Sequence, residues 1–273
     1  MKKCLNNITL GTEVPFADSV LAAGRAGFDG IEIFSLEPAQ RYVESSSLDE
    51  LVSMFTSLEI EPVGFVLGGF VYQGEKDFAG NIPILTENMA FASEIGAKNA
   101  LLFIPSRGEL GEREAVEVAT DRISQACDLA AQHGLVIGLE PIGNADFLNT
   151  PASLLPIIRG VGAKNLALTV DLFHFYTGGC STGDLLEIPG NMINLVHLDD
   201  APDLPGLDDS KRVLPGDGSM DVAGFLGALR DIGFDGPLSV ELFNRDLWGR
   251  EPDQVAFESM RALDSVMERA GVG

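Results

Sequence analysis

The 273-residue sequence is poor in basic residues and in long apolar runs, and each shortage excludes a class of protein. It holds 18 Lys and Arg against 41 Asp and Glu, which gives a net charge of −23. A surface this acidic repels the phosphates of nucleic acids and anionic lipids, so we expect no nucleic-acid partner and no membrane partner. No run approaches the roughly 18 apolar residues that a membrane-spanning helix requires.

Cysteine is also scarce, with Cys4, Cys127 and Cys180 far apart and no C-x-x-C pair. An odd number of scattered cysteines indicates reduced thiols rather than a disulfide framework. The first residues show no apolar stretch after Lys2 and Lys3, so we predict no signal peptide. Together these features predict a cytoplasmic protein.

The sequence does contain a regular alternation of short apolar runs and longer amphipathic segments. The apolar runs, which we predict to be strands, are Ile8–Gly11, Gly30–Phe34, Pro62–Leu67, Ala100–Ile104, Leu135–Glu140, Leu166–Phe173, Ile193–Leu198 and Pro237–Phe243. The predicted helices are Phe16–Ala26, Leu48–Leu58, Ile82–Ile95, Arg113–His133, Pro151–Gly160, Gly183–Ile188, Val222–Ile232 and Gln254–Ala270. Eight strands alternating with eight helices favour an α/β fold, a single (β/α)8 TIM barrel that spans residues 1–273 as one domain.

Polar residues gather at the ends of the last four predicted strands, where the active site of such a barrel lies. The four strands end in turn with Glu140, Asp171, His197 and Glu241. A single acid at a strand end is often a buried ion-pair partner or faces solvent. Four polar side chains at the same depth on four successive strands, however, must converge at the barrel mouth. Three carboxylates and one imidazole suit one divalent cation, with Mn²⁺, Mg²⁺ or Co²⁺ favoured by the oxygens and Zn²⁺ by the imidazole.

Three further residues are candidates at the mouth. His174 follows Asp171 by three positions and would either bind a substrate oxygen or orient Asp171. Arg212 lies in the long irregular segment Asp199–Met220, before a Pro-Gly-Asp-Gly turn, and would either reach a substrate oxygen or face solvent. Glu32 lies near the end of the second predicted strand, where it would either line the barrel mouth or form a structural ion pair.

Motifs in the second half resemble those of a known family. The segment DLFH at 171–174 is similar to the D-x-x-H segment of xylose-isomerase-like sugar isomerases and epimerases. The segments HLDD at 197–200, RVLPGDG at 212–218 and SVELF at 239–243 resemble the inosose isomerase branch of that family. The resemblance is close from Leu135 to Trp248. In the first half it is a resemblance of pattern only, as in Gly27–Ile33.

The resemblance implies one divalent metal ion (Mn, Mg, Co or Zn), no organic cofactor, and a small polyol-ketone substrate. The ligands it implies are Glu140, Asp171, His197 and Glu241. It implies further that Glu140 and Glu241 move the proton while His174 and Arg212 contact substrate oxygens. The expected activity is isomerisation or epimerisation of a keto-inositol or ketose through an enediolate. Members of the family often form dimers, so a homodimer is expected, although the sequence shows no interface.

Two other function classes remain open at this point. A dehydratase of the 3-dehydroshikimate type would use the same enolate to expel a hydroxyl group. It needs a basic group for its anionic substrate, and Arg107 is the nearest candidate, because the residues after Glu140, Pro141-Ile142-Gly143, include no lysine. A non-catalytic sugar-binding barrel would keep the pocket but lose a metal ligand, and all four ligands are present.

Overall fold

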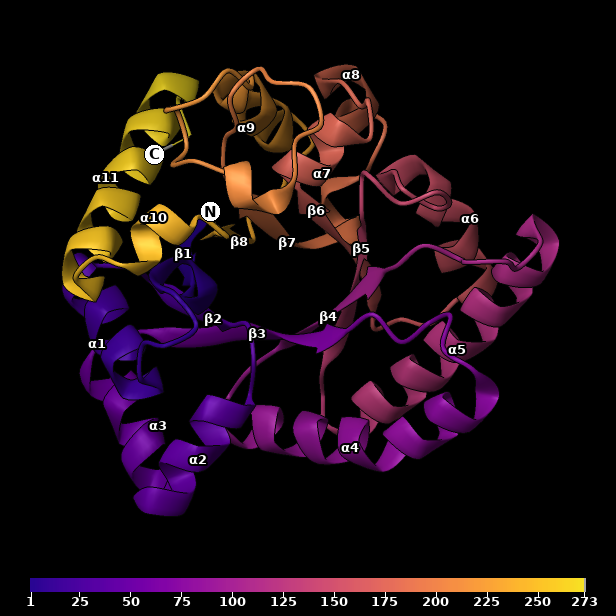
Figure 1. The fold of residues 1–273 in the computed structure, drawn as a ribbon, viewed down its shortest axis with the longest axis horizontal. Helices are drawn as coiled ribbons and strands as arrows, with labels where there is room; N and C mark the ends of the chain where they lie inside the picture. The colour runs from indigo at the N-terminus through magenta and orange to yellow at the C-terminus, as the bar shows by residue number, and fades with distance from the viewer. Residues whose placement is uncertain (273) are drawn as a thin grey trace.

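The computed structural model describes residues 1–272. In it, eight parallel strands close into a barrel, with β1 hydrogen-bonded to β8 (Figure 1). The strands are β1 (Lys2–Asn6), β2 (Gly30–Ile33), β3 (Glu61–Gly68), β4 (Asn99–Ile104), β5 (Val136–Pro141), β6 (Leu166–Asp171), β7 (Ile193–Leu198) and β8 (Pro237–Val240). This is the fold that the alternation of segments predicts.

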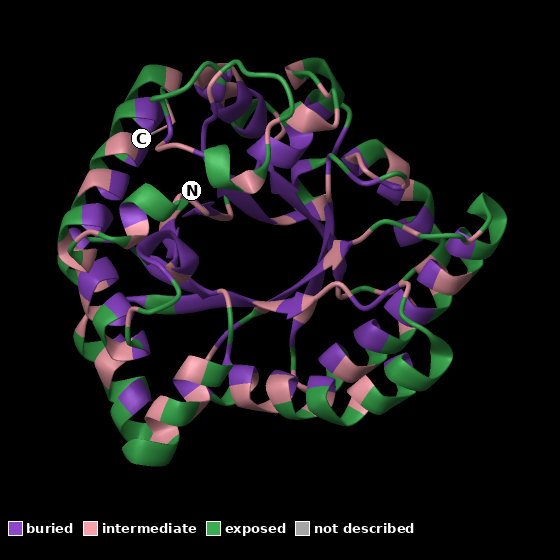
Figure 2. Ribbon diagram, in the orientation of Figure 1, coloured by how far each residue is buried: buried purple, intermediate pink, exposed green. Residues whose placement is uncertain are grey.

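Helices form an outer ring around the strands (Figure 1). They are α1 (Phe16–Ala26), α2 (Glu37–Ser45), α3 (Leu48–Ser57), α4 (Glu75–Glu94), α5 (Glu112–Gln132), α6 (Pro151–Val161), α7 (Leu172–Thr177), α8 (Thr182–Leu186), α9 (Val222–Asp231), α10 (Arg245–Trp248) and α11 (Pro252–Ala270). Figure 2 shows buried residues along the strands and on the inner faces of the helices, with exposed residues on the outer faces. Among residues 1–272, no helix is long and apolar enough to cross a membrane.

The first strand lies earlier in the chain than predicted. The prediction of a strand at Ile8–Gly11 is wrong, because β1 is Lys2–Asn6 and the following Asn7–Leu10 is a 3₁₀ turn, η1. The Asn6 side chain accepts a hydrogen bond from the backbone N–H of Ile8 at 3.2 Å and so caps this turn. The run Ile8-Thr9-Leu10 has the apolar character of a buried strand. These side chains are indeed buried, but the backbone that carries them forms a turn.

The sixth strand is shorter than predicted. It ends at Asp171, and the chain turns directly into α7. The Asp171 carboxylate caps α7 by accepting the backbone N–H of His174 at 2.8 Å. His174 therefore lies on a helix and not on a strand. With α7, α2 and α10 added, the described residues form eleven α-helices instead of the predicted eight.

Two glycines set the position of β2. Gly27 ends α1 with a φ of 85°, in the left-handed region that residues with a Cβ rarely adopt. Gly30 begins β2, and a Cβ at this position would lie 2.5 Å from a Val63 methyl group on β3. The absence of a side chain leaves room for Val63 and Cys4. Because side chains alternate along a strand, Glu32, two residues later, lies on the same face of β2 as Gly30.

The segment 199–220 after β7 is fastened by a single buried carboxylate. Asp200 accepts four backbone N–H groups, from Ala201 (2.8 Å), Gly216 (3.1 Å), Gly218 (2.9 Å) and Met220 (2.9 Å). Asp200 also pairs with Val213 in an antiparallel β-bridge. The segment therefore has a defined path, and Arg212 is held beside the barrel mouth.

Candidate active site

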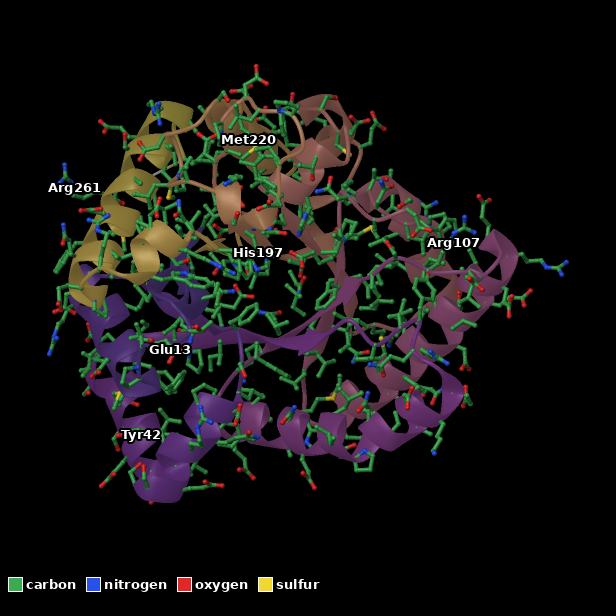
Figure 3. All side chains as sticks on the ribbon, viewed as in Figure 1. Glu13, Tyr42, Arg107, His197, Met220 and Arg261 are labelled. Carbon is green, nitrogen blue, oxygen red and sulfur yellow. The ribbon has the colours of Figure 1, made fainter. Side chains whose placement is uncertain are left out.

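The barrel brings the four predicted metal ligands together at the carboxyl ends of its strands. One ligand atom from each of Glu140, Asp171, His197 and Glu241 lies within 4.8 Å of the others, and all four residues are buried. Asp171 and His197 are direct partners in the β6–β7 register, so their side chains lie next to each other. Figure 3 shows His197 near the centre of the barrel.

His197 lies between carboxylates on both sides of its ring. Its Nδ1 lies 2.8 Å from Glu140 Oε1, 3.3 Å from Glu241 Oε2 and 3.4 Å from Asp171 Oδ2. Its Nε2 lies 3.0 Å from Glu32 Oε2 on the other side. Burial opposes a charged imidazole, but the carboxylates of Glu241, Glu32 and Glu140 outweigh it and raise the pKa of His197 well above its usual value.

Arg212 reaches into the same cluster from the loop after β7. Its Nη1 donates to Asp171 Oδ2 at 2.6 Å, to Asp199 Oδ2 at 2.8 Å and to Glu241 Oε2 at 3.2 Å. The residue is only 1% exposed, so it is not a solvated surface arginine. Its side chain also stacks on Phe173, with the guanidinium carbon 4.8 Å from the ring centre.

The carboxylates in this cluster differ in their pKa shifts. Burial opposes ionisation of Asp171, but the charge of Arg212 outweighs it and holds the pKa of Asp171 well below its usual value. Burial, reinforced by Glu140 and Glu32, raises the pKa of Glu241 to about 8, against the opposing effect of His197 and Arg212. Asp171 lies beside both Arg212 and His197, whereas Glu241 is also crowded by the carboxylates of Glu140 and Glu32.

The donor set fits a divalent cation. Five buried carboxylates, those of Glu32, Glu140, Asp171, Asp199 and Glu241, face one arginine and one histidine. Burial and the nearby Asp171 charge raise the pKa of Asp199 well above its usual value, and its Oδ1 has no hydrogen-bond partner within residues 1–272. The cluster thus carries more negative charge than its own cations neutralise, and oxygen ligands with one imidazole suit the metals named above.

His174 lies beside Arg212 and lines the cavity described below. Its Nε2 lies 3.2 Å from Arg212 Nη2, and since a guanidinium only donates, Nε2 accepts this hydrogen bond. In the described part of the chain, Nδ1 is buried without a partner. It is the backbone N–H of His174, not its ring, that bonds Asp171. The ring therefore borders the cavity, but its Nδ1 does not open onto it.

A cavity of about 430 Å³ opens beside these groups. Its polar lining consists of Glu140, His174, Asp209, Arg212 and Glu241, and its apolar lining consists of Phe34, Val66, Leu101, Phe103, Pro105, Ile142 and Phe243. A larger hollow of about 780 Å³ lies at the opposite end, among the starts of β1, β3, β4 and β8. We assign the site to the smaller cavity because it adjoins the ligand cluster and lies at the carboxyl ends of the strands.

Arg107 does not reach this cavity. Its Nε lies 3.3 Å from Asp146 Oδ2, and its guanidinium carbon lies 5.1 Å from the centre of the Phe147 ring. Figure 3 shows Arg107 to the right of the barrel, away from His197, and it is not among the residues that line the cavity. The anion anchor that a dehydratase would need is therefore not supplied by Arg107.

Sequence reasoning missed Asn6. Its Nδ2 donates to Glu241 Oε1 at 2.8 Å, and its Oδ1 is occupied by the backbone N–H of Ile8, so the orientation of the amide is fixed. The predicted first strand, Ile8–Gly11, begins after Asn6, so the sequence does not place Asn6 at a strand end. The signal in the sequence is the buried polar residue that ends the short run Lys2–Asn6.

Comparison with known proteins agrees with this geometry. A family model described as xylose isomerase-like TIM barrel matches residues 20–266. The chain belongs to this family. An inosose isomerase of Bacillus velezensis is 28% identical over 98% of both chains. A 3-dehydroshikimate dehydratase of Pseudomonas aeruginosa is 27% identical over 96% of this chain but only 41% of its own length.

A solved structure of the IolI protein with a bound zinc atom superposes with a TM-score of 0.92, at 27% identity and 99% coverage of both chains. The family and its isomerase relatives identify the chain as an enzyme of the metal-using isomerase and epimerase type. The zinc in that neighbour, together with the ligand cluster, points to a divalent metal without fixing which one.

Proposed function

We propose that this enzyme isomerises or epimerises a neutral keto-inositol or ketose by moving a proton between two glutamates. The observation that carries the proposal is the convergence of Glu140 and Glu241 on one cavity that also holds His174 and Arg212. The relative named inosose isomerase supports this substrate class, since it matches the chain along almost its full length.

The metal site is proposed to consist of Glu140, Asp171, His197 and Glu241. A divalent metal held there would supply a Lewis acid that stabilises negative charge on a substrate oxygen. The identity of the metal is left to measurement among Mn²⁺, Mg²⁺, Co²⁺ and Zn²⁺.

The proton transfer is assigned to the two glutamates because they follow β5 and β8 and so approach the cavity from different strands. One carboxylate removes the proton from the carbon beside the carbonyl, and the other returns a proton, either to the opposite face or to the neighbouring carbon. Positioned proton transfer of this kind contributes about 10²–10⁴-fold to the rate. Asn6 holds Glu241 in place throughout, because its amide donates to Oε1.

Substrate oxygens are bound by His174 and Arg212. The ring of His174 contacts one substrate oxygen in this proposal, since the residue lines the cavity next to Arg212. Arg212 contributes the positive charge at the same wall of the cavity, where Phe173 and Phe243 hold its guanidinium between their rings. These two residues favour the oxyanion over the neutral ketone.

The cations of the cavity favour an isomerase over a dehydratase of dehydroshikimate. That substrate carries a carboxylate, which calls for a cationic side chain of its own. Arg212 is already shared among Asp171, Asp199, Asp209 and Glu241, and Arg107 lies elsewhere. A neutral, non-phosphorylated polyol-ketone needs no such anchor.

The deciding experiment is proton NMR in D₂O with metal-loaded protein and a panel of inososes and free ketoses. Entry of deuterium at one carbon beside the carbonyl, with an isomer appearing, supports the proposal and identifies the substrate. Loss of water from added 3-dehydroshikimate, with no exchange in the panel, would assign the chain to the dehydratases.

Two further expectations concern the protein in the cell. Its three cysteines are free, which supports the proposed cytoplasmic location. The family resemblance also predicts a homodimer. Sedimentation equilibrium tests this prediction by measuring the mass of the protein in solution.

A further inference from the structure

Glu32 is a buried carboxylate that the proposed reaction does not use. It is 0% exposed, and within residues 1–272 its hydrogen bonds go to a single atom, His197 Nε2, at 3.1 Å from Oε1 and 3.0 Å from Oε2. It comes from β2 and meets a residue of β7, 165 positions later in the chain. Burying a carboxylate is unfavourable unless its charge is compensated, so its presence at the centre of the barrel requires a reason.

The geometry on the two sides of the imidazole supplies that reason. Glu32 faces Nε2, whereas the oxygens of Glu140, Asp171 and Glu241 all face Nδ1. A cation held by Glu140, Asp171 and Glu241 would lie on the Nδ1 side of the ring, so Nδ1 is the nitrogen that faces it. Glu32 lies on the other side, where a carboxylate can only accept, so it would hold the ring proton on Nε2 once Nδ1 binds the metal.

We propose that Glu32 is a positioning residue that fixes the tautomer and the rotation of His197, so that Nδ1 is presented to the metal. The proposal rests on the metal site proposed above. Carboxylates that accept the second N–H of a metal-bound histidine orient the ring and make its other nitrogen a stronger donor. Glu32 does not touch the cavity, so its effect on the reaction passes through His197.

An ion pair that only stabilises the barrel is the competing explanation. A buried ion pair is weak support for stability, because desolvation of both charges offsets their attraction. The two explanations differ in what they predict for His197. A stabilising pair changes the unfolding transition, whereas a positioning residue changes which nitrogen carries the proton and how tightly the metal binds.

The first test needs no substitution. The chain has only three histidines, His133, His174 and His197, so ¹⁵N-histidine labelling gives a spectrum in which each ring can be assigned. In the zinc-loaded protein, we expect His197 to show a protonated Nε2 and a metal-bound Nδ1. A metal-bound Nε2 would overturn the proposal.

The second test replaces the carboxylate. In Glu32→Gln, the amide can also donate toward the ring, so we expect loss of the fixed tautomer and a 10- to 100-fold weaker zinc affinity in chelator competition. Glu32→Asp keeps the charge on a shorter side chain, and we expect an intermediate affinity with the wild-type tautomer. The matched control is Ile31→Val on the same strand, which loosens the core but leaves every carboxylate in place.

The outcomes separate this proposal from the proposed function. A wild-type chain that binds no divalent metal overturns the metal site itself. A wild-type chain that binds zinc, with unchanged affinity and an unchanged His197 tautomer in Glu32→Gln, overturns only the role of Glu32. If Glu32→Gln does not fold, Glu32→Asp and the wild-type spectrum still decide the question.

Discussion

The two arcs of the barrel wall, β1–β4 and β5–β8, contribute different chemistry to one cavity. From the first arc and the residues that follow its strands come only apolar lining side chains, namely Phe34, Val66, Leu101, Phe103 and Pro105. From the second arc and its loops come all the charged ones. Two buried polar residues of the first arc, Asn6 and Glu32, contact Glu241 and His197 respectively and take no part in lining the cavity.

This division has a physical basis in the sheet. Ligands on neighbouring strands inherit their spacing from the β-ladder, as the pairing of Asp171 with His197 shows. The first arc adjoins the second where β1 pairs with β8 and where β4 pairs with β5. Its residues can set the shape of the cavity or support a ligand from behind, as Glu32 supports His197 and as Asn6 supports Glu241 from the neighbouring strand. The second arc thus provides the chemistry, and the first arc provides shape and support.

The largest effect should follow from removing a glutamate of the second arc. Glu241→Gln and Glu140→Gln keep the size of the side chain but lose the base. We expect folded proteins whose substrate deuterium exchange falls by about 10²–10⁴-fold. Either variant retaining wild-type exchange would remove that glutamate from the mechanism, and circular dichroism controls for folding.

The next largest effect should come from the loop that belongs to the second arc. Asp200→Asn exchanges a carboxylate oxygen for an NH₂ group that faces backbone donors. We expect the free energy of unfolding to fall by about 2 to 3 kcal/mol in urea titrations, since bonds to a charged acceptor are lost. Asp217→Asn, at an exposed position of the same segment, is the control and should change it by less than about 0.5 kcal/mol.

A smaller effect should follow in the first arc. Phe34 lines the cavity and packs edge-on against Phe243, with ring centres 5.5 Å apart. In Phe34→Ala we expect KM to rise about 10-fold with kcat and bound metal little changed, because lost apolar contact weakens binding only. Phe257→Ala, at an exposed position on α11, is the matched control. Loss of metal from Phe34→Ala would contradict the division between the arcs.

The smallest effect concerns a polar group beside the first arc. Burial, with a contribution from Asp146, raises the pKa of Tyr72 to about 12 from 10.0. The phenol ionises at a lower pH in the unfolded chain than in the folded protein. The free energy of unfolding should therefore fall as the pH rises from about 10 toward 12. An absorbance titration at 295 nm should show a late tyrosinate that disappears in Tyr72→Phe and persists in Tyr176→Phe.

The sequence predicts the barrel well because each strand is short, apolar and followed by an amphipathic segment. It fails where local pattern and tertiary environment disagree. Ile8 and Leu10 look like strand residues, yet they are buried in a turn, and the true strand begins with two lysines at the barrel rim. At the sixth strand, the apolar run continues beyond Asp171 because α7 is buried as well.

The candidate site is predicted in part for a similar reason. Polar residues at strand ends can be identified from the sequence, which predicts the set Glu140, Asp171, His197 and Glu241, and the structure brings these four side chains together. Contacts between side chains that lie far apart in the sequence cannot be identified in this way. Nothing near Glu32 or Asn6 in sequence indicates that their partners lie 165 and 235 residues away.

The contact between Asn6 and Glu241 has a consequence for folding. The two residues meet only when β8 pairs with β1 and the ring closes. Until β8 pairs, Glu140, Asp171 and His197 can lie together on neighbouring strands, but Glu241 stays apart from them. Assembly of the complete proposed ligand set is therefore coupled to closure of the barrel.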